Sequence, residues 1–141
     1  MYKLLFLLIL NANPQYELYL SLEYHPSPVY EQEWKISIYR NQKSVRIVSE
    51  NFQNKNFNRP LDFDEYIDLL QKLNSAGIWS TKSNYDEKYP ASFYYLVIKS
   101  KKRLNLIKFY SPQEHPDNRG NYDIIKRTIE NYATLYNPSN R

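Results

Sequence analysis

Cysteine is absent from this 141-residue chain, and glycine and histidine occur only twice each. A chain without cysteine has no disulfide, no thiolate zinc site, no iron–sulfur cluster and no cysteine nucleophile. Gly77 and Gly120 lie too far apart to form a glycine-rich phosphate-binding loop, and His25 and His115 cannot be a helical pair of metal ligands. Most common enzyme signatures are thereby excluded, and we predict no catalytic residue, no metal and no cofactor.

A strong excess of one charge is also lacking. Nineteen basic and fifteen acidic residues give a net charge of +4, and the two signs are interspersed along the chain. Nucleic-acid-binding proteins usually concentrate basic residues on one face, so we predict no nucleic-acid partner. Tyrosine is abundant, with 15 residues. Tyrosine suits strands and interfaces, but the plentiful lysine, asparagine and isoleucine equally fit the composition that an A+T-rich genome encodes.

The first twelve residues have the three parts of a secretory signal. Lys3 gives a positive start, a leucine-rich block follows, and Ala12 is a small residue at the exit. A buried strand over residues 2–10 is the alternative, although the block does not alternate. We expect residues 1–12 to be a signal peptide, residues 13–141 to be a single domain, and the protein to be periplasmic or secreted. The block is too short to cross a bilayer as a helix, so no membrane span is predicted.

Alternation of apolar and polar residues predicts strands. Leu18, Leu20 and Leu22, for example, fall on one face of a strand. We interpret Asn41-Gln42 as a two-residue hairpin turn. We interpret the amide-rich residues 51–60 as a loop. The predicted strands are residues 16–24, 34–40, 44–49, 92–100 and 103–110.

Two helices are predicted, the first over residues 63–76. Asp62 is its N-cap, Glu65 completes a capping box, and Gly77 ends the helix in a left-handed conformation. We expect an apolar stripe of this helix to dock on the sheet, and it consists of Phe63, Ile67, Leu70 and Leu73. The second helix covers residues 122–136, with a core face of Ile125, Ile129, Tyr132 and Tyr136.

The order of these elements, β-β-β-α-β-β-α, predicts an α+β fold. An antiparallel sheet of about five strands would carry both helices on one face. The stretch from Leu61 to Leu70, followed by Gly77-Ile78-Trp79, resembles small exported bacterial α+β domains of unknown function. The resemblance extends over about residues 34–136. It implies a fold and no catalytic residue, because its motif is one of helix capping and packing.

The polar loop between the last strand and the last helix is the first candidate site. It gathers Glu114, His115, Asp117 and Arg119, which offer oxygen and imidazole ligands for a metal, or a base with an orienting carboxylate. The alternative is a solvated loop of turn-forming residues. His25, beside two prolines, is expected to be a surface turn residue.

The second candidate site is the basic hairpin tip that contains Lys101, Lys102 and Arg103. Such a tip suits an anionic partner, or it protects the sheet from pairing with neighbouring molecules. The loop Tyr85–Tyr89, with two aromatic residues and mixed charge, is a further candidate interface.

These patterns favour a non-enzymatic binding domain of the bacterial cell envelope, with an envelope protein or a glycan as partner. The alternative function is a small hydrolase or metal-dependent enzyme that uses the loop from Glu114 to Arg119.

Overall fold

The computed structural model describes residues 17–27, 31–112 and 120–140. The elements in chain order are β1 (Leu18–His25), β2 (Trp34–Arg40), β3 (Val45–Phe52), β4 (Lys55–Pro60), α2 (Phe63–Ser75), β5 (Phe93–Ser100), β6 (Leu104–Tyr110), α3 (Asn121–Tyr136) and the 3-10 turn η2 (Pro138–Asn140).

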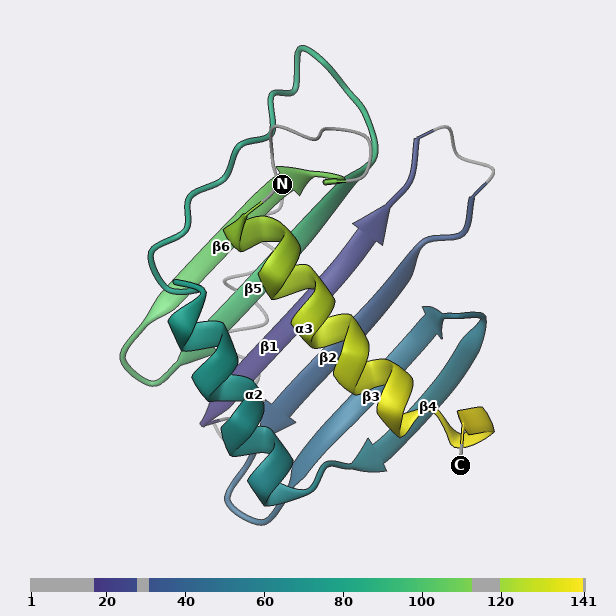
Figure 1. Ribbon diagram of the computed structural model, residues 1–141, viewed down its shortest axis with the longest axis vertical. Coiled ribbons are helices and arrows are strands. Elements are labelled where there is room, and N and C mark those ends of the chain that lie inside the picture. The colour runs from purple at the N-terminus through teal and green to yellow at the C-terminus, as the bar shows by residue number, and fades with distance from the viewer. Residues whose placement is uncertain (1–16, 28–30, 113–119, 141) are drawn as a thin grey trace.

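The strands form one antiparallel sheet in the order β4-β3-β2-β1-β5-β6. β1 lies inside this sheet, where Leu20 is opposite Ile38 of β2 on one side and Ile98 of β5 on the other. Both helices lie over the same face of the sheet (Figure 1). The predicted α+β fold, with its three-strand meander and later hairpin, is therefore confirmed, with six strands where about five were expected.

The core lies between the sheet and the two helices. Alternation along each strand directs one set of apolar side chains toward the helices, and most of that set is fully buried. The face away from the helices is not uniformly exposed, since Ser21, Ser37 and Val97 on it are buried. The buried side chains of the core include Leu20, Leu22, Ile36, Ile38, Ile47, Leu69, Leu73, Ile78, Leu96, Ile98, Ile107, Phe109, Ile125 and Ile129.

A row of aromatic rings crosses the helix-facing side of the sheet, with one ring from each of five strands. Ring centroids of neighbours in this row are 4.8 to 5.8 Å apart, within the range of favourable aromatic pairs. Tyr122 extends the row from α3, at 5.2 Å from Phe109. The row consists of Phe52, Trp34, Tyr24, Tyr94 and Phe109.

β4 corrects the prediction of a loop over residues 51–60. Gln53 and Asn54 form the two-residue connection between β3 and β4, and both have positive φ, at 54° and 58°. Two positive φ values are typical of the type I′ turn that suits a tight hairpin. The hairpin turn predicted at Asn41-Gln42 is present, but its predicted length of two residues is wrong, because β2 and β3 are joined by four residues. There the Asn41 side-chain oxygen accepts the backbone N–H groups of Lys43 and Ser44, each at 2.9 Å.

The caps of α2 agree with the sequence in two of three points. The Asp62 carboxylate accepts the backbone N–H of Asp64 at 2.9 Å, and Gly77 has a φ of 76°. The capping box with Glu65 is replaced by a tertiary contact, because the Asp62 backbone N–H donates to the hydroxyl of Tyr136 at 3.1 Å. The end of α3 therefore helps to begin α2.

The docked face of α2 differs from the predicted stripe. Tyr66, Leu69 and Leu73 are buried, whereas Phe63 has 51% of its surface exposed. Ile67 and Leu70 are only partly buried. Of the four residues expected to dock, Leu73 alone is fully buried. The buried face of α2 is turned toward α3 relative to the predicted stripe, because α2 packs against α3 as well as the sheet.

α3 has the predicted core face, with Ile125, Ile129, Tyr132 and Tyr136 all buried. Lys126 is also buried, 2.5 Å from Glu130 and 5.3 Å from the ring of Tyr94. In the described ranges, no helix combines the length and the apolar character that crossing a membrane requires.

Candidate functional site

Two of the sequence predictions fall on residues that the structure does not describe. Glu114, His115, Asp117 and Arg119 lie within residues 113–119, and the expected signal peptide lies within residues 1–16. A metal-dependent or hydrolytic role of the loop and export of the chain therefore remain predictions.

The basic hairpin tip lies where the sequence places it, between β5 and β6. The Ser100 backbone N–H donates to the Arg103 carbonyl at 2.9 Å, and the Ser100 hydroxyl accepts the backbone N–H groups of Lys102 and Arg103. Lys101 and Lys102 are exposed. Arg103 reaches back to Trp79, with its guanidinium carbon 4.1 Å from the ring centroid. The tip is thus connected to the segment that follows α2.

The two flanks of α2 have different surroundings. On one flank the Tyr132 hydroxyl of α3 donates to Asp68, which also pairs with Lys72 at 2.9 Å. The other flank carries Phe63, Ile67 and Leu70, which follow one another at helical spacing. We call these three residues, together with Trp79, the apolar flank. All four are exposed or only partly buried.

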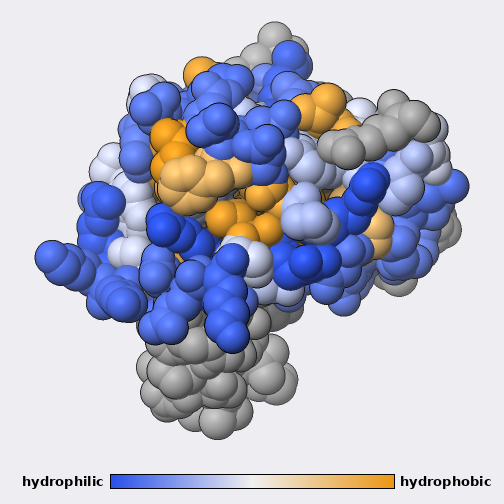
Figure 2. Space-filling model, turned by 90° about the horizontal axis from the view of Figure 1, so that it is seen from below, coloured by the Kyte–Doolittle hydropathy of each residue, from blue (hydrophilic) through white to orange (hydrophobic). Residues whose placement is uncertain are grey.

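Cations border the apolar flank at both ends. Arg40 lies 5.2 Å from the ring of Phe63, and Arg103 covers Trp79. A shallow depression of about 340 Å³ adjoins Phe63 and is lined by residues 40–45 and 60–61. Figure 2 shows hydrophobic surface at this end of the molecule, surrounded by hydrophilic side chains. We call the surrounding cations the basic rim, which consists of Arg40, Lys43, Lys101, Lys102 and Arg103.

Most charges of the basic rim have no internal counterion. Arg40 forms an ion pair with Glu17 at 3.2 Å. Among the described residues, the other four cations of the rim form no ion pair. Exposed cations beside exposed apolar side chains form a surface that suits an acidic, partly apolar partner.

A second polar cluster lies at the opposite end of the sheet, and sequence reasoning missed it. His25 ends β1 rather than forming a surface turn, and its two ring nitrogens lie 3.0 Å from Glu23 and 3.4 Å from Glu33. Lys35 of β2 is 3.5 Å from the other oxygen of Glu23. The ring of His25 stacks on Phe93 at 4.8 Å. The alternation of β1, with Glu23 and His25 on one face, is the signal that could have revealed it.

The charges of this cluster stabilise one another. The hydrogen bond to Glu23 is the main cause that raises the pKa of His25, against the opposing effect of burial. The same hydrogen bond is the main cause that lowers the pKa of Glu23. Lys35 also has a raised pKa, because the charge and hydroxyl of Tyr19 and the charge of Glu23 outweigh the effect of burial.

This cluster borders a shallow surface depression of about 230 Å³. Both imidazole nitrogens already face carboxylates, so His25 is not placed to take a proton from a substrate. Within the described part of the chain, no group of three or more histidine, aspartate or glutamate side chains is arranged to hold a metal ion. The cluster therefore cross-links β1 to the segment before β2.

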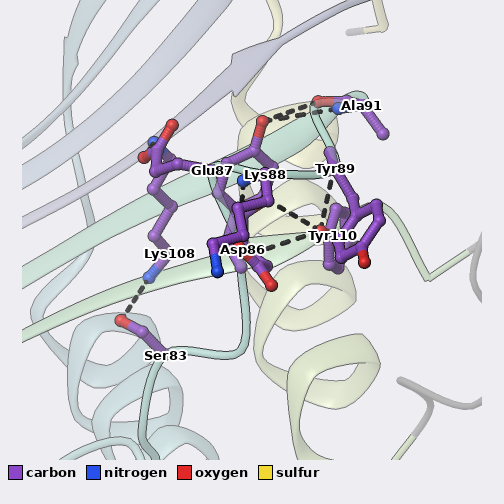
Figure 3. A network of polar contacts seen from close by, with 9 residues as sticks. Ser83, Asp86, Glu87, Lys88, Tyr89, Ala91, Lys108 and Tyr110 are labelled. Atoms are coloured by element: carbon purple, nitrogen blue, oxygen red, sulfur yellow. Dashed lines mark hydrogen bonds and ion pairs between the residues drawn. The ribbon is translucent and has the colours of Figure 1, made fainter.

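The loop Tyr85–Tyr89, a further candidate interface, is engaged within the chain itself. The Tyr110 hydroxyl accepts the Asp86 backbone N–H and shares its single proton between the carbonyls of Asp86, at 3.1 Å, and Tyr89, at 2.9 Å (Figure 3). The loop is thereby fixed against β6. Tyr89 itself is 70% exposed.

Comparison of the chain with family models, with curated proteins and with solved structures found no match.

Proposed function

We propose that the chain is a non-enzymatic binding domain of the bacterial cell envelope and that it binds a partner protein through the apolar flank and the basic rim. The observation that supports this proposal is the exposed ring of Phe63, which lies between the buried face of α2 and the cation of Arg40. Lys43, which has no ion pair among the described residues, lines the depression that adjoins Phe63. A partner that covers this region therefore gains apolar burial and charge pairing together.

The proposed partner presents apolar side chains flanked by carboxylates. Apolar groups would cover Phe63, Ile67 and Leu70, and carboxylates would approach Lys101 and Lys102 at the hairpin tip. Flat rings with cations over them, at Phe63 and Trp79, are typical of the residues that contribute most to protein interfaces. The envelope location rests on the N-terminal pattern of Lys3, the leucine block and Ala12.

Site-specific photocrosslinking in the native host tests the proposal. A photoreactive phenylalanine analogue at position 63 is expected to give a discrete crosslinked product. The matched control is position 124, because Ile124 is 50% exposed on α3, away from the apolar flank. Reversal of the tip charges with Lys101→Glu and Lys102→Glu is expected to remove the product. Equal products from positions 63 and 124, or a product that survives charge reversal, would contradict the proposal.

N-terminal sequencing of the native protein tests export separately. We expect a mature start near Asn13, and a retained Met1 would exclude cleavage.

A further inference from the structure

The two edge strands of the sheet, β6 and β4, differ in how far their outward backbone groups are hydrogen-bonded. At the β6 edge, the segment before β5 bonds the outward backbone groups. The Ser83 hydroxyl donates to the Leu106 carbonyl and accepts the Lys108 N–H, and the Asn84 N–H donates to the Lys108 carbonyl. The Asn84 side chain accepts the Tyr110 N–H at 3.3 Å. This edge is covered by the chain's own backbone and side chains (Figure 3).

The β4 edge is covered less than the β6 edge. β4 is the last strand on its side of the sheet, and among the described residues all hydrogen bonds to its backbone come from β3. Two of them come from side chains, since Arg46 donates to the Asn58 carbonyl at 3.2 Å and the Ser49 hydroxyl donates to the Lys55 carbonyl at 2.9 Å. The N–H groups of Asn56 and Asn58 have no such cover in the described part of the chain, and Pro60 has no N–H. One side chain of β4 contacts the end of α3, since the Arg59 guanidinium donates to the Tyr136 carbonyl at 3.3 Å. An edge strand with free backbone groups is a template for an added strand.

The side chains of β4 limit which strand can be added. Lys55, Phe57 and Arg59 share the face toward the helices, because they lie opposite Phe52, Ser49 and Ile47 of that face. Among the described residues, no ion pair reaches Lys55, Arg59 or the neighbouring Arg46 of β3. The edge therefore presents two uncompensated cations on either side of an aromatic ring.

A second copy of the chain is a poor occupant of this edge. Antiparallel pairing of two β4 strands about Phe57 would place Lys55 opposite Arg59, and like charges directly opposite one another destabilise a strand pair. The two cations of β4 thus oppose self-association and favour a strand with negatively charged side chains.

We propose that the β4 edge binds an extended segment of a partner protein in which carboxylate side chains alternate with apolar ones, and that this segment becomes a seventh strand of the sheet. Carboxylates of the added strand lie opposite Lys55 and Arg59, and an apolar side chain covers Phe57. This site is separate from the apolar flank, and it binds backbone as well as side chains.

Fluorescence anisotropy with labelled octapeptides tests this site. The probe is a peptide of alternating glutamate and valine, and the controls are its alternately N-methylated form and a peptide of alternating lysine and valine. We expect the first peptide to bind and to slow amide exchange in β4. The N-methylated peptide loses the backbone hydrogen bonds of an added strand, so neither control is expected to bind.

Charge reversal of one exposed lysine assigns the binding to β4. Lys55→Glu is expected to weaken the glutamate–valine peptide about fivefold or more, because an opposite-charge pair becomes a like-charge pair. Lys82→Glu makes the same change of net charge at an exposed lysine outside both proposed sites and is expected to leave the affinity unchanged. Circular dichroism melts confirm that both variants are folded. Equal weakening by both variants, equal binding of the N-methylated peptide, or no binding of the first peptide would overturn the proposal.

Discussion

The two ends of the sheet differ in how their charges are paired. At the end with Glu23 and Glu33, the carboxylates face the imidazole of His25 and the ammonium of Lys35 within 3.5 Å. At the other end, Lys101 and Lys102 have no ion pair in the described part of the chain, and Phe63 is half exposed. One end is compensated internally, whereas the other leaves both charge and apolar surface available.

This difference separates a contribution to stability from a contribution to binding. Charges that pair across strands hold the β1–β2 end together, and their removal should affect folding. Unpaired cations on a hairpin tip contribute little to folding, because exposed charges are screened by solvent. Substitutions at the β1–β2 end should therefore lower stability, whereas substitutions at the hairpin tip should weaken binding and leave stability almost unchanged.

The largest effect is expected in the buried face of α2 rather than in its apolar flank. Leu73→Ala should lower the free energy of unfolding by about 2–5 kcal/mol, because it leaves a cavity in the core. Phe63→Ala should lower it by about 1 kcal/mol, because about half of the side chain is buried, while it removes the proposed partner contact. Urea melts measure both, and an equal cost for the two variants would show that Phe63 belongs to the core.

The pH dependence of stability tests the compensated end. Because the pKa of His25 is raised in the fold, its contribution is complete below the ordinary histidine value of 6.5 and is lost as pH rises through the raised pKa. The pKa of Glu23 is lowered, so its contribution is complete above the ordinary value of 4.5 and is lost as pH falls through the lowered pKa. Wild type and His25→Phe should therefore differ most between pH 4.5 and 6.5.

The expected difference in that window is about 1 kcal/mol, the usual value of a partly buried charged hydrogen bond. Phenylalanine retains a ring against Phe93, so the comparison isolates the charge. Glu33→Gln should have a smaller effect, because the side chain of Glu33 is 70% exposed. Parallel stability curves of wild type and His25→Phe across the whole pH range would show that the cluster is not linked to folding.

A carboxylate at the basic end should also contribute to folding, but through backbone capping. Asp62→Ala should cost about 1 kcal/mol, because the Asp64 N–H loses its acceptor at the start of α2. Asp64→Asn is the matched control and should change stability by less than about 0.5 kcal/mol, since Asp64 is exposed. Thermal melts should separate the two, and similar values would point to the charge of the first turn rather than to the cap.

The smallest effect on stability is expected from the cation over Trp79. Arg103→Gln should cost about 0.5 kcal/mol or less, because a cation–π contact at an exposed site is weak. The same variant should reduce the yield of the product crosslinked through position 63. If Arg103→Gln caused a large loss of stability and left the yield of crosslinked product unchanged, the hairpin tip would contribute to folding rather than to binding.

The elements that the sequence predicts well are those with a strong apolar period. β1 and α3 have such periods, and their buried faces agree with the prediction. β4 has no such period, because Lys55–Pro60 is polar on both faces apart from Phe57, and it acquires strand structure from pairing with β3. The alternation that reveals a half-buried strand does not exist in such an edge strand.

The candidate sites show the same limit. The tip of Lys101, Lys102 and Arg103 follows from local sequence, since a hairpin turn involves neighbouring residues. Its contact with Trp79 depends on where α2 ends above the sheet, which no local pattern specifies. Likewise, His25 and Glu33 meet because β1 and β2 pair in one register, with Glu23 opposite Lys35. Register is a property of two strands and a turn together.

The position of β1 inside the sheet has a consequence for how the chain folds during synthesis. Leu18 pairs with Ser100 and His25 with Phe93, so β2, β3, β4 and α2 emerge from the ribosome before the second neighbour of β1 does. Pairing between such distant segments is slow, because a long loop must close first. Until β5 arrives, the meander of β1 to β4 has two open edges, and α3 is not yet made to cover its part of the apolar face. The nascent chain therefore remains prone to aggregation until its last third is made.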